Sequence, residues 1–291
     1  MSTADGGLAT TVFGPSDDER ALLAIHGITA NGRSWDTVAA LLARRRMIAP
    51  DLRGRGRSNA LPGPYGLRTH AADLAALLDA DGGAPRTVIG HSMGAFVAVA
   101  LAGARPDLVD RLVLVDGGLP LALPADVARV EDLDLGALLG PAAQRLSMEF
   151  ADDDAYLAFW RAHPAFARDW SPAVEAYARY DLDGEVPHRR ASAVAAAMFE
   201  DGAELYGPDW YLDALRSLRM PVTVLRAPRG LTDAEPLYPA GALEGFRELV
   251  PQLEVVEVDD VNHYTILFAD RGAVRVAAAA SAHPNPTKES T

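Results

Sequence analysis

Short apolar runs alternate along the chain with longer amphipathic stretches. The runs predict buried β-strands at residues 21–25, 47–49, 87–89, 112–115, 222–225 and 253–258. The stretches between them predict helices at residues 35–45, 69–81, 95–104, 242–249 and 273–280. The run at 112–115 contains no polar residue, as expected when helices cover both faces of a sheet. The pattern predicts an α/β fold with a mostly parallel, doubly wound sheet.

The alternation is interrupted between residues 118 and 218. This stretch is helical in pattern, is cut into short pieces by prolines, and is dense in aromatic residues. We therefore expect a core built from residues 1–117 and 219–281, with residues 118–218 as a helical insertion. The polar, proline-containing tail at 282–291 is expected to be disordered.

Composition narrows the possible partners and locations. With 291 residues, 49% of them hydrophobic, the chain can bury a large core. Its net charge of −13 and the absence of a long basic run argue against nucleic acid or a membrane surface as partner. The chain has no cysteine, which excludes disulfides, thiolate metal sites and cysteine nucleophiles. No secretory signal or membrane-spanning run is visible, so a cytoplasmic location is expected. The oligomeric state is not predicted.

A Gly-x-Ser-x-Gly sequence, from Gly90 through Ser92 to Gly94, stands between a predicted strand and a predicted helix. A serine at such a turn has strained backbone angles and projects its hydroxyl above the sheet edge. The glycines are needed because strand and helix pass too closely for a Cβ. The helix that follows directs its N-terminal amides at the reacting centre. We therefore expect Ser92 to be a nucleophile; a turn serine that only caps a helix is the alternative.

At these residues the chain resembles the α/β-hydrolase family, and the resemblance covers nearly all of it outside the insertion. His26 and Gly27, after the strand predicted at 21–25, look like the family's oxyanion-loop motif. The resemblance implies that the backbone N–H groups of Ile28 and Met93 hold the developing oxyanion. For His26 itself we expect only a hydrogen bond that fixes the loop. Residues 51–58 are similar to a structural loop of the family, and we expect no catalytic role for their arginines.

A serine hydroxyl needs a base to take its proton. His263 follows the last predicted strand, where the resemblance places the catalytic histidine, and the order nucleophile, acid, histidine is also the family's. His163, in the insertion, is a candidate for substrate contact.

Two aspartates compete for the role of the acid that orients His263. The family commonly places this acid in a Gly-x-x-Asp turn after the strand that follows the insertion. Gly230 and Asp233 have that spacing, although the loop is longer than usual. Asp116 directly ends the strand at 112–115, a position that some family members use, but aspartates before glycines are also common in turns. We prefer Asp233 and keep Asp116 as the alternative acid.

The aromatic insertion resembles the helical lid of this family. We expect Trp160 and Trp170 to contact an apolar substrate group, unless the aromatics form only the insertion's own core. The resulting prediction is a serine hydrolase, without cofactor or metal, that cleaves an ester-type bond of a small, largely apolar substrate through an acyl-enzyme. A thioesterase, a lactonase, and a carbon–carbon bond hydrolase or lyase remain alternatives on the same triad. A non-catalytic ligand receptor is the alternative of another class.

Overall fold

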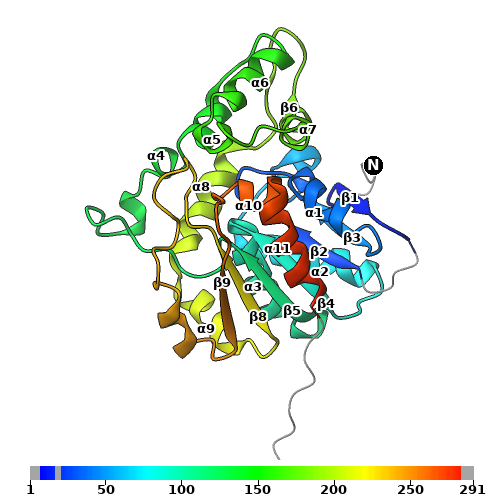
Figure 1. The fold of residues 1–291 in the computed structure, drawn as a ribbon, viewed down its shortest axis with the longest axis vertical. Helices are drawn as coiled ribbons and strands as arrows, with labels where there is room; N and C mark the ends of the chain where they lie inside the picture. Colours follow the sequence, from blue (N-terminus) through cyan, green and yellow to red (C-terminus); the bar gives the residue numbers. More distant parts are fainter. Residues whose placement is uncertain (1–6, 17–20, 283–291) are drawn as a thin grey trace, which may run out of the picture.

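The computed structural model describes residues 7–16 and 21–282, so the tail predicted at 282–291 lies outside the described residues except for Ala282. Its centre is a seven-stranded sheet in the order β1-β3-β2-β4-β5-β8-β9 (Figure 1). The strands are β1 (Thr10–Phe13), β2 (Leu22–Ile25), β3 (Met47–Pro50), β4 (Arg86–His91), β5 (Val109–Val115), β8 (Val222–Arg226) and β9 (Leu253–Glu257). All neighbouring strands are parallel except β1 and β3. The predicted mostly parallel sheet is confirmed.

The helices fall into two groups. Those that follow the core strands or pack on them are α1 (Asp36–Leu41), α2 (Leu67–Ala80), α3 (Met93–Ala104), α9 (Asp209–Ser217), α10 (Thr265–Phe268) and α11 (Asp270–Ser281). The remaining helices come, like α9, between β5 and β8 in the chain. They are α4 (Leu135–Leu139), α5 (Pro141–Gln144), α6 (Asp153–Arg161), α7 (Pro172–Tyr180) and α8 (Ala195–Ala203). A small two-stranded sheet of β6 (Leu182–Asp183) and β7 (Arg190–Ala191) accompanies this second group.

The sheet is apolar on both faces because helices cover both. In β5, Leu112 and Leu114 belong to one buried cluster, which includes residues of α2, α3 and α9. Val113 and Val115 belong to a second cluster, which includes residues of α1 and α11. Successive side chains of a strand point to opposite faces, so a strand buried on both sides must be apolar at every position. This explains why the central strands could be recognised as continuous apolar runs.

The insertion between β5 and β8 is not one structural unit. Figure 1 shows α5, α6, α7 and β6 as a lobe at one end of the molecule. By contrast, α9 packs on α3, with the ring centroid of Tyr211 5.5 Å from that of Phe96. A Cβ at Gly103 would lie 2.8 Å from the Cβ of Ala214, so this glycine allows the two helices their close approach. The insertion predicted to end at residue 218 therefore includes α9, a helix that packs on the core.

Other elements differ from the sequence prediction in length or type. The helix predicted at 35–45 is only α1, preceded by a 3₁₀-helix (Gly32–Trp35), and the helix predicted at 242–249 is a 3₁₀-helix (Glu244–Glu248). Glycines at 241 and 245 explain the second difference, because glycine weakens an α-helix. Strand β1 was not predicted, since an antiparallel edge strand with polar threonines lacks the buried apolar pattern. None of the helices in the described ranges has the length and hydrophobicity needed to cross a membrane.

Candidate active site

Ser92 lies at a sharp turn between β4, which ends at His91, and α3. Its backbone has φ 55° and ψ −127°, a conformation that residues other than glycine rarely adopt. A Cβ at Gly90 would lie 2.3 Å from the carbonyl oxygen of Gly94, and a Cβ at Gly94 would lie 2.2 Å from that of Ile25. Both glycines are thus required by close backbone contacts. The strand–turn–helix geometry expected around Ser92 is present.

His263 is joined to Asp116 rather than to Asp233. The distance between His263 Nδ1 and Asp116 Oδ2 is 2.6 Å, and both side chains are buried. The other carboxylate oxygen, Oδ1, accepts a hydrogen bond from Ala227 N at 3.0 Å. An ionised carboxylate only accepts, so the proton of His263 is on Nδ1, which leaves Nε2 able to act as a base. Asp116 has φ 44° and is followed by Gly117, where a Cβ would lie 2.3 Å from the carbonyl oxygen of Ser92.

Asp233 has different partners, so the sequence-based preference for it as the partner of His263 is wrong. Its Oδ1 accepts hydrogen bonds from Arg229 Nε at 2.7 Å and from Asn262 Nδ2 at 2.9 Å. Partial burial opposes ionisation, but these two hydrogen bonds and the charge of Arg229 lower the pKa of Asp233. The long loop after β8 explains the error, because it places Asp233 against the guanidinium of Arg229 in the same loop.

His91 fixes the backbone of His263 from the other side. Its Nε2 donates a hydrogen bond to the carbonyl oxygen of His263 at 2.8 Å, and the two ring centroids are 4.6 Å apart. Burial, with a smaller contribution from the neighbouring His263, lowers the pKa of His91 well below its usual value. A neutral His91 adds no positive charge beside the ring that is to accept a proton.

The loop at residues 26–30 passes directly over Ser92. A Cβ at Gly27 would lie 3.2 Å from the Cβ of Ser92. His26 donates from Nδ1 to the carbonyl oxygen of Gly27 at 2.8 Å and accepts from Leu52 N at Nε2, at 2.9 Å. Burial lowers the pKa of His26 to about 3, so the ring is neutral and this hydrogen-bonding pattern is fixed. The expectation that His26 fixes the loop is confirmed.

The two amides expected to hold an oxyanion lie on either side of Ser92. Ile28 is in the loop that passes over Ser92, and Met93 is the first residue of α3. The first amides of a helix have no partner within it. Nor does the N–H of Ile28 donate to another backbone group in the part of the chain that the structure describes. Both amides are thus open to an external acceptor.

Two fully buried arginines hold the carbonyl groups of this loop. Arg55 Nε donates to the carbonyl oxygen of Ile28 at 2.9 Å, and Arg145 Nη2 donates to that of Thr29 at 2.5 Å. Arg55 lies in the loop at 51–58, where no catalytic role was expected, and Arg145 follows α5 in the insertion. The structural role expected for the loop at 51–58 is thus specific. Through Arg55, this loop fixes the orientation of the peptide groups beside Ser92.

Each of these arginines is neutralised by a carboxylate of the insertion. Arg55 Nη2 is 2.5 Å from Asp201 Oδ2, and Arg145 Nη2 is 3.1 Å from Asp181 Oδ2. Asp201 Oδ2 also contacts His70 Nε2 at 2.9 Å. Because a charge in the protein interior needs a partner, the insertion and the loop beside Ser92 are energetically linked. Neither ion pair could be recognised from the sequence, since the partners are far apart along the chain.

Removing the charge of Asp201 should strongly destabilise the fold. In Asp201→Asn the guanidinium of Arg55 stays buried without a counter-charge, and we expect the free energy of unfolding to fall by about 3–5 kcal/mol. The matched control is Asp213→Asn, which breaks the exposed Asp213–Arg216 pair and should cost less than about 1 kcal/mol. Urea-induced unfolding of both variants measures the difference. Equal losses would show that the buried pair does not stabilise the fold.

Ser92 and His263 line one small cavity of about 30 Å³. Its other walls are the loop at 27–30, side chains Leu139 and Ala142 of the insertion, and Tyr177, Leu231 and Tyr264. No hydrogen bond between Ser92 Oγ and the His263 ring is found among the described residues, and such bonds often tighten only when substrate binds. The cavity holds little more than one water molecule, so a larger ligand requires lining side chains to move.

Neither tryptophan predicted to contact substrate lines this cavity. Trp160 is buried behind the tyrosines of the wall, with its ring centroid 6.0 Å from Tyr177 and 6.3 Å from Tyr264. Trp170 borders a different hollow, near the outer side of α7, with Arg161 stacked 5.0 Å from its ring centroid. These aromatics form the insertion's own packing, the alternative that the sequence left open. His163 is also buried outside the cavity wall.

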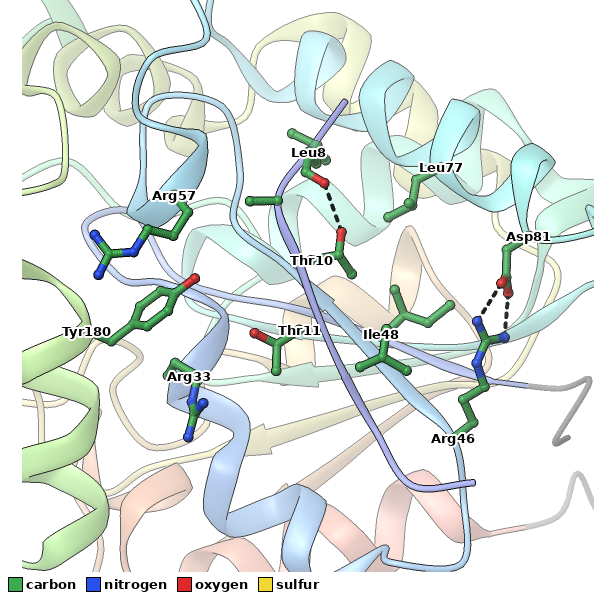
Figure 2. Close-up of a pocket in the computed structure, with 12 residues that line it drawn as sticks. Leu8, Thr10, Thr11, Arg33, Arg46, Ile48, Arg57, Leu77, Asp81 and Tyr180 are labelled. Carbon is green, nitrogen blue, oxygen red and sulfur yellow. Dashed lines mark hydrogen bonds and ion pairs between the residues drawn. The ribbon is translucent and has the colours of Figure 1, made fainter. Parts of the chain in front are cut away.

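A wider hollow of about 930 Å³ lies elsewhere, along β1 (Figure 2). Arg33, Arg57 and Tyr180 stand at one end of it, and the Arg46–Asp81 ion pair stands at the other. It contains neither Ser92 nor His263, so volume alone would misplace the reactive centre. Within residues 7–16 and 21–282 no cluster of three or more His, Asp or Glu is placed to hold a metal ion.

Comparison with known proteins gives consistent matches. A family model described as the alpha/beta hydrolase fold matches residues 20–270. Lipase LipV of Mycobacterium tuberculosis is 43% identical over 129 residues, which are 44% of this chain and 47% of that protein. The chain thus spans about half the length of this relative. 2-(Acetamidomethylene)succinate hydrolase of Mesorhizobium japonicum is 29% identical over 84% of this chain and 81% of its own. A crystal structure of E-2-(acetamidomethylene)succinate hydrolase has a TM-score of 0.76 at 25% identity, covering 93% of this chain and 92% of that one.

Proposed function

The chain belongs to the α/β-hydrolase fold family, and on that basis we propose that it is a serine hydrolase that cleaves an ester-type bond through an acyl-enzyme. One observation carries the proposal: His263, whose Nδ1 lies 2.6 Å from Oδ2 of the buried Asp116, lines the same cavity as a strained Ser92. A serine, a histidine base and an acid that orients the base are the parts that nucleophilic acyl transfer needs. Relatives named as a lipase and a succinate-derivative hydrolase agree with hydrolysis.

In the proposed mechanism, Ser92 Oγ attacks the substrate carbonyl while His263 Nε2 takes its proton. Asp116 stabilises the imidazolium that forms, and the amides of Ile28 and Met93 hold the oxyanion. His263 then donates the proton to the leaving alcohol, which departs as the acyl-enzyme forms. Water, deprotonated by His263, attacks the acyl-enzyme, and Ser92 regains its proton when the acid is released.

The cavity wall supports a small, largely apolar acyl group. Ile28, Leu139 and Leu231 line it, and the insertion supplies Leu139 from the five-residue helix α4. Because the cavity holds little more than one water molecule, the insertion would act as a lid whose side chains move when the acyl group enters. The proposed substrate size is therefore set by how far these side chains can separate.

Rates should rise with the length of the acyl chain until the pocket is filled. Each buried methylene contributes about 0.8 kcal/mol, so going from acetate to butyrate esters should raise kcat/KM by roughly tenfold. Leu231→Ala should move the optimum to longer chains, whereas Trp170→Ala, outside the cavity, should leave the profile unchanged. Kinetics with p-nitrophenyl esters whose acyl chains have about two to eight carbons check this. A flat profile in all three proteins would place the acyl group elsewhere.

A substrate panel tests the proposal against its alternatives. The values of kcat/KM are compared for an ester, a thioester and a lactone with the same acyl group. We expect the wild-type protein to hydrolyse the ester and Ser92→Ala not to do so. A much higher kcat/KM for the thioester or the lactone would favour those activities on the same residues. Binding of these compounds without any turnover would favour a ligand receptor.

A further inference from the structure

Two tyrosines of the cavity wall have no hydrogen-bond partner for their hydroxyl groups among the described residues. Tyr177 lies on α7 and Tyr264 directly follows His263; both side chains are buried and both line the cavity with Ser92. No hydrogen bond from either hydroxyl is found in the part of the chain described here. Neither oxygen is among the fully enclosed polar atoms that lack a partner, so each keeps some accessible surface, and both residues line the cavity. Buried phenols ordinarily have a hydrogen-bond partner.

The histidine beside Tyr264 has no free acceptor nitrogen. His163, whose ring centroid is 5.3 Å from that of Tyr264, accepts a hydrogen bond from Ala165 N at Nδ1. Burial lowers the pKa of His163 to about 4, so the ring is neutral and its proton is on Nε2. This Nε2 is fully enclosed and has no acceptor among the described residues. The His163 ring therefore offers the tyrosines no free acceptor nitrogen.

Asp181, the carboxylate whose charge acts on Tyr177, is already occupied as an acceptor. Asp181 accepts from Arg145 and Tyr156 at Oδ2 and from Ser192 at Oδ1. Burial raises the pKa of Tyr264 to about 12 and that of Tyr177 well above its usual value, although the charge of Arg145 opposes both shifts. Both tyrosines are thus protonated at neutral pH. They are two O–H donors on residues that line the cavity together with the apolar side chains of Leu139 and Leu231.

We propose that Tyr177 and Tyr264 form a subsite for an oxygen acceptor, a carbonyl or carboxylate oxygen, in the acyl part of the substrate. The proposal rests on the proposed function, because it places this oxygen in the acyl group that Ser92 would receive. The apolar wall would take the carbon skeleton, and the two hydroxyls would take the oxygen. A substrate without the oxygen would bury the two hydroxyl groups and leave them without an acceptor. Sites whose buried polar groups are left unpaired in this way discriminate strongly against such a substrate.

Three methyl esters with one skeleton test the subsite: methyl 4-oxopentanoate, monomethyl succinate and methyl 4-methylpentanoate. They carry a ketone, a carboxylate and an all-carbon branch at the same position. We expect kcat/KM for at least one of the oxygen-bearing esters to exceed that of the all-carbon ester by at least about tenfold. In Tyr177→Phe/Tyr264→Phe this ratio should fall to near one. The control Tyr206→Phe, whose ring is half-buried outside the cavity, should keep the wild-type ratio.

Binding to Ser92→Ala protein separates this proposal from the proposed function. Calorimetric titration with the same three esters measures binding alone. It therefore depends neither on hydrolysis nor on whether the tyrosine variants fold. Tighter binding of an oxygen-bearing ester supports the subsite even if the wild-type protein hydrolyses none of them, an outcome that would refute only the proposed function. Equal binding of all three esters, or tighter binding of the all-carbon ester, would overturn the subsite.

Discussion

Asp116→Asn is expected to lower kcat by about 10⁴, by analogy with the buried acid of serine proteases. Asparagine can keep the hydrogen bond that Asp116 Oδ1 accepts from Ala227 N, so the fold should be retained. Its amide group, however, would donate to His263 Nδ1 and favour the tautomer with the proton on Nε2. That tautomer cannot take a proton from Ser92. Steady-state kinetics on the best ester of the panel, with unfolding curves to show an intact fold, measure the effect.

Asp233→Asn is the matched control, since both aspartates have positive φ and follow core strands. The carboxylate of Asp233 contacts Arg229 and Asn262 and not His263, so its loss should lower kcat by no more than about tenfold, through the position of Asn262 next to the base. If Asp233→Asn were the crippling change and Asp116→Asn nearly neutral, the proposed triad would be wrong.

The strands and the turn at Ser92 could be predicted because their causes are local. Residues 112–115 are apolar at every position since β5 is covered on both faces, and no distant information is needed to see this. Likewise Gly90 reflects a backbone contact within one strand–turn–helix unit, whereas Gly94 is required by the carbonyl oxygen of Ile25 in the neighbouring strand β2. Edge strand β1 escaped prediction because its burial depends on a single neighbour in the sheet.

The acid could not be chosen from spacing. Asp116 and His263 are 147 positions apart, and what joins them is the parallel pairing of β5 with β8 and of β8 with β9, together with the turn that Asp116 makes at φ 44°. Asp233 had the expected distance from Gly230, but the partner it would find, Arg229, depends on how the loop folds back. Sequence order gave the two candidates, and tertiary geometry decides which one reaches the histidine.

The aromatic residues show a similar limit. Their number in residues 118–218 indicated a packed insertion, but not which rings would face Ser92. Trp160 and Tyr177 differ only in which side of the insertion's core they occupy: Tyr177 borders the cavity, and Trp160 packs behind it. For Tyr264 a signal did exist, since it is adjacent to His263 in sequence. The buried arginines gave no such signal, because Arg55 and Arg145 look like surface residues until their aspartate partners are placed.

Ser92→Ala is expected to have the largest effect of all, a loss of about 10⁶ in kcat, comparable to loss of the nucleophile in a serine protease. The fold should survive, because the backbone N–H of Ser92, not its hydroxyl, donates to the carbonyl oxygen of Val115 at 2.9 Å. Alanine at φ 55° carries the same backbone strain as serine. Single-turnover and steady-state assays, with an unfolding curve as control, measure the loss.

The most direct test of the central claim is to react the protein with a fluorophosphonate and to map the adduct by mass spectrometry. The proposed mechanism predicts one covalent adduct per chain, located in the peptide that contains Ser92, and no adduct in Ser92→Ala. A label on a different serine, or ester turnover that persists in Ser92→Ala, would contradict it.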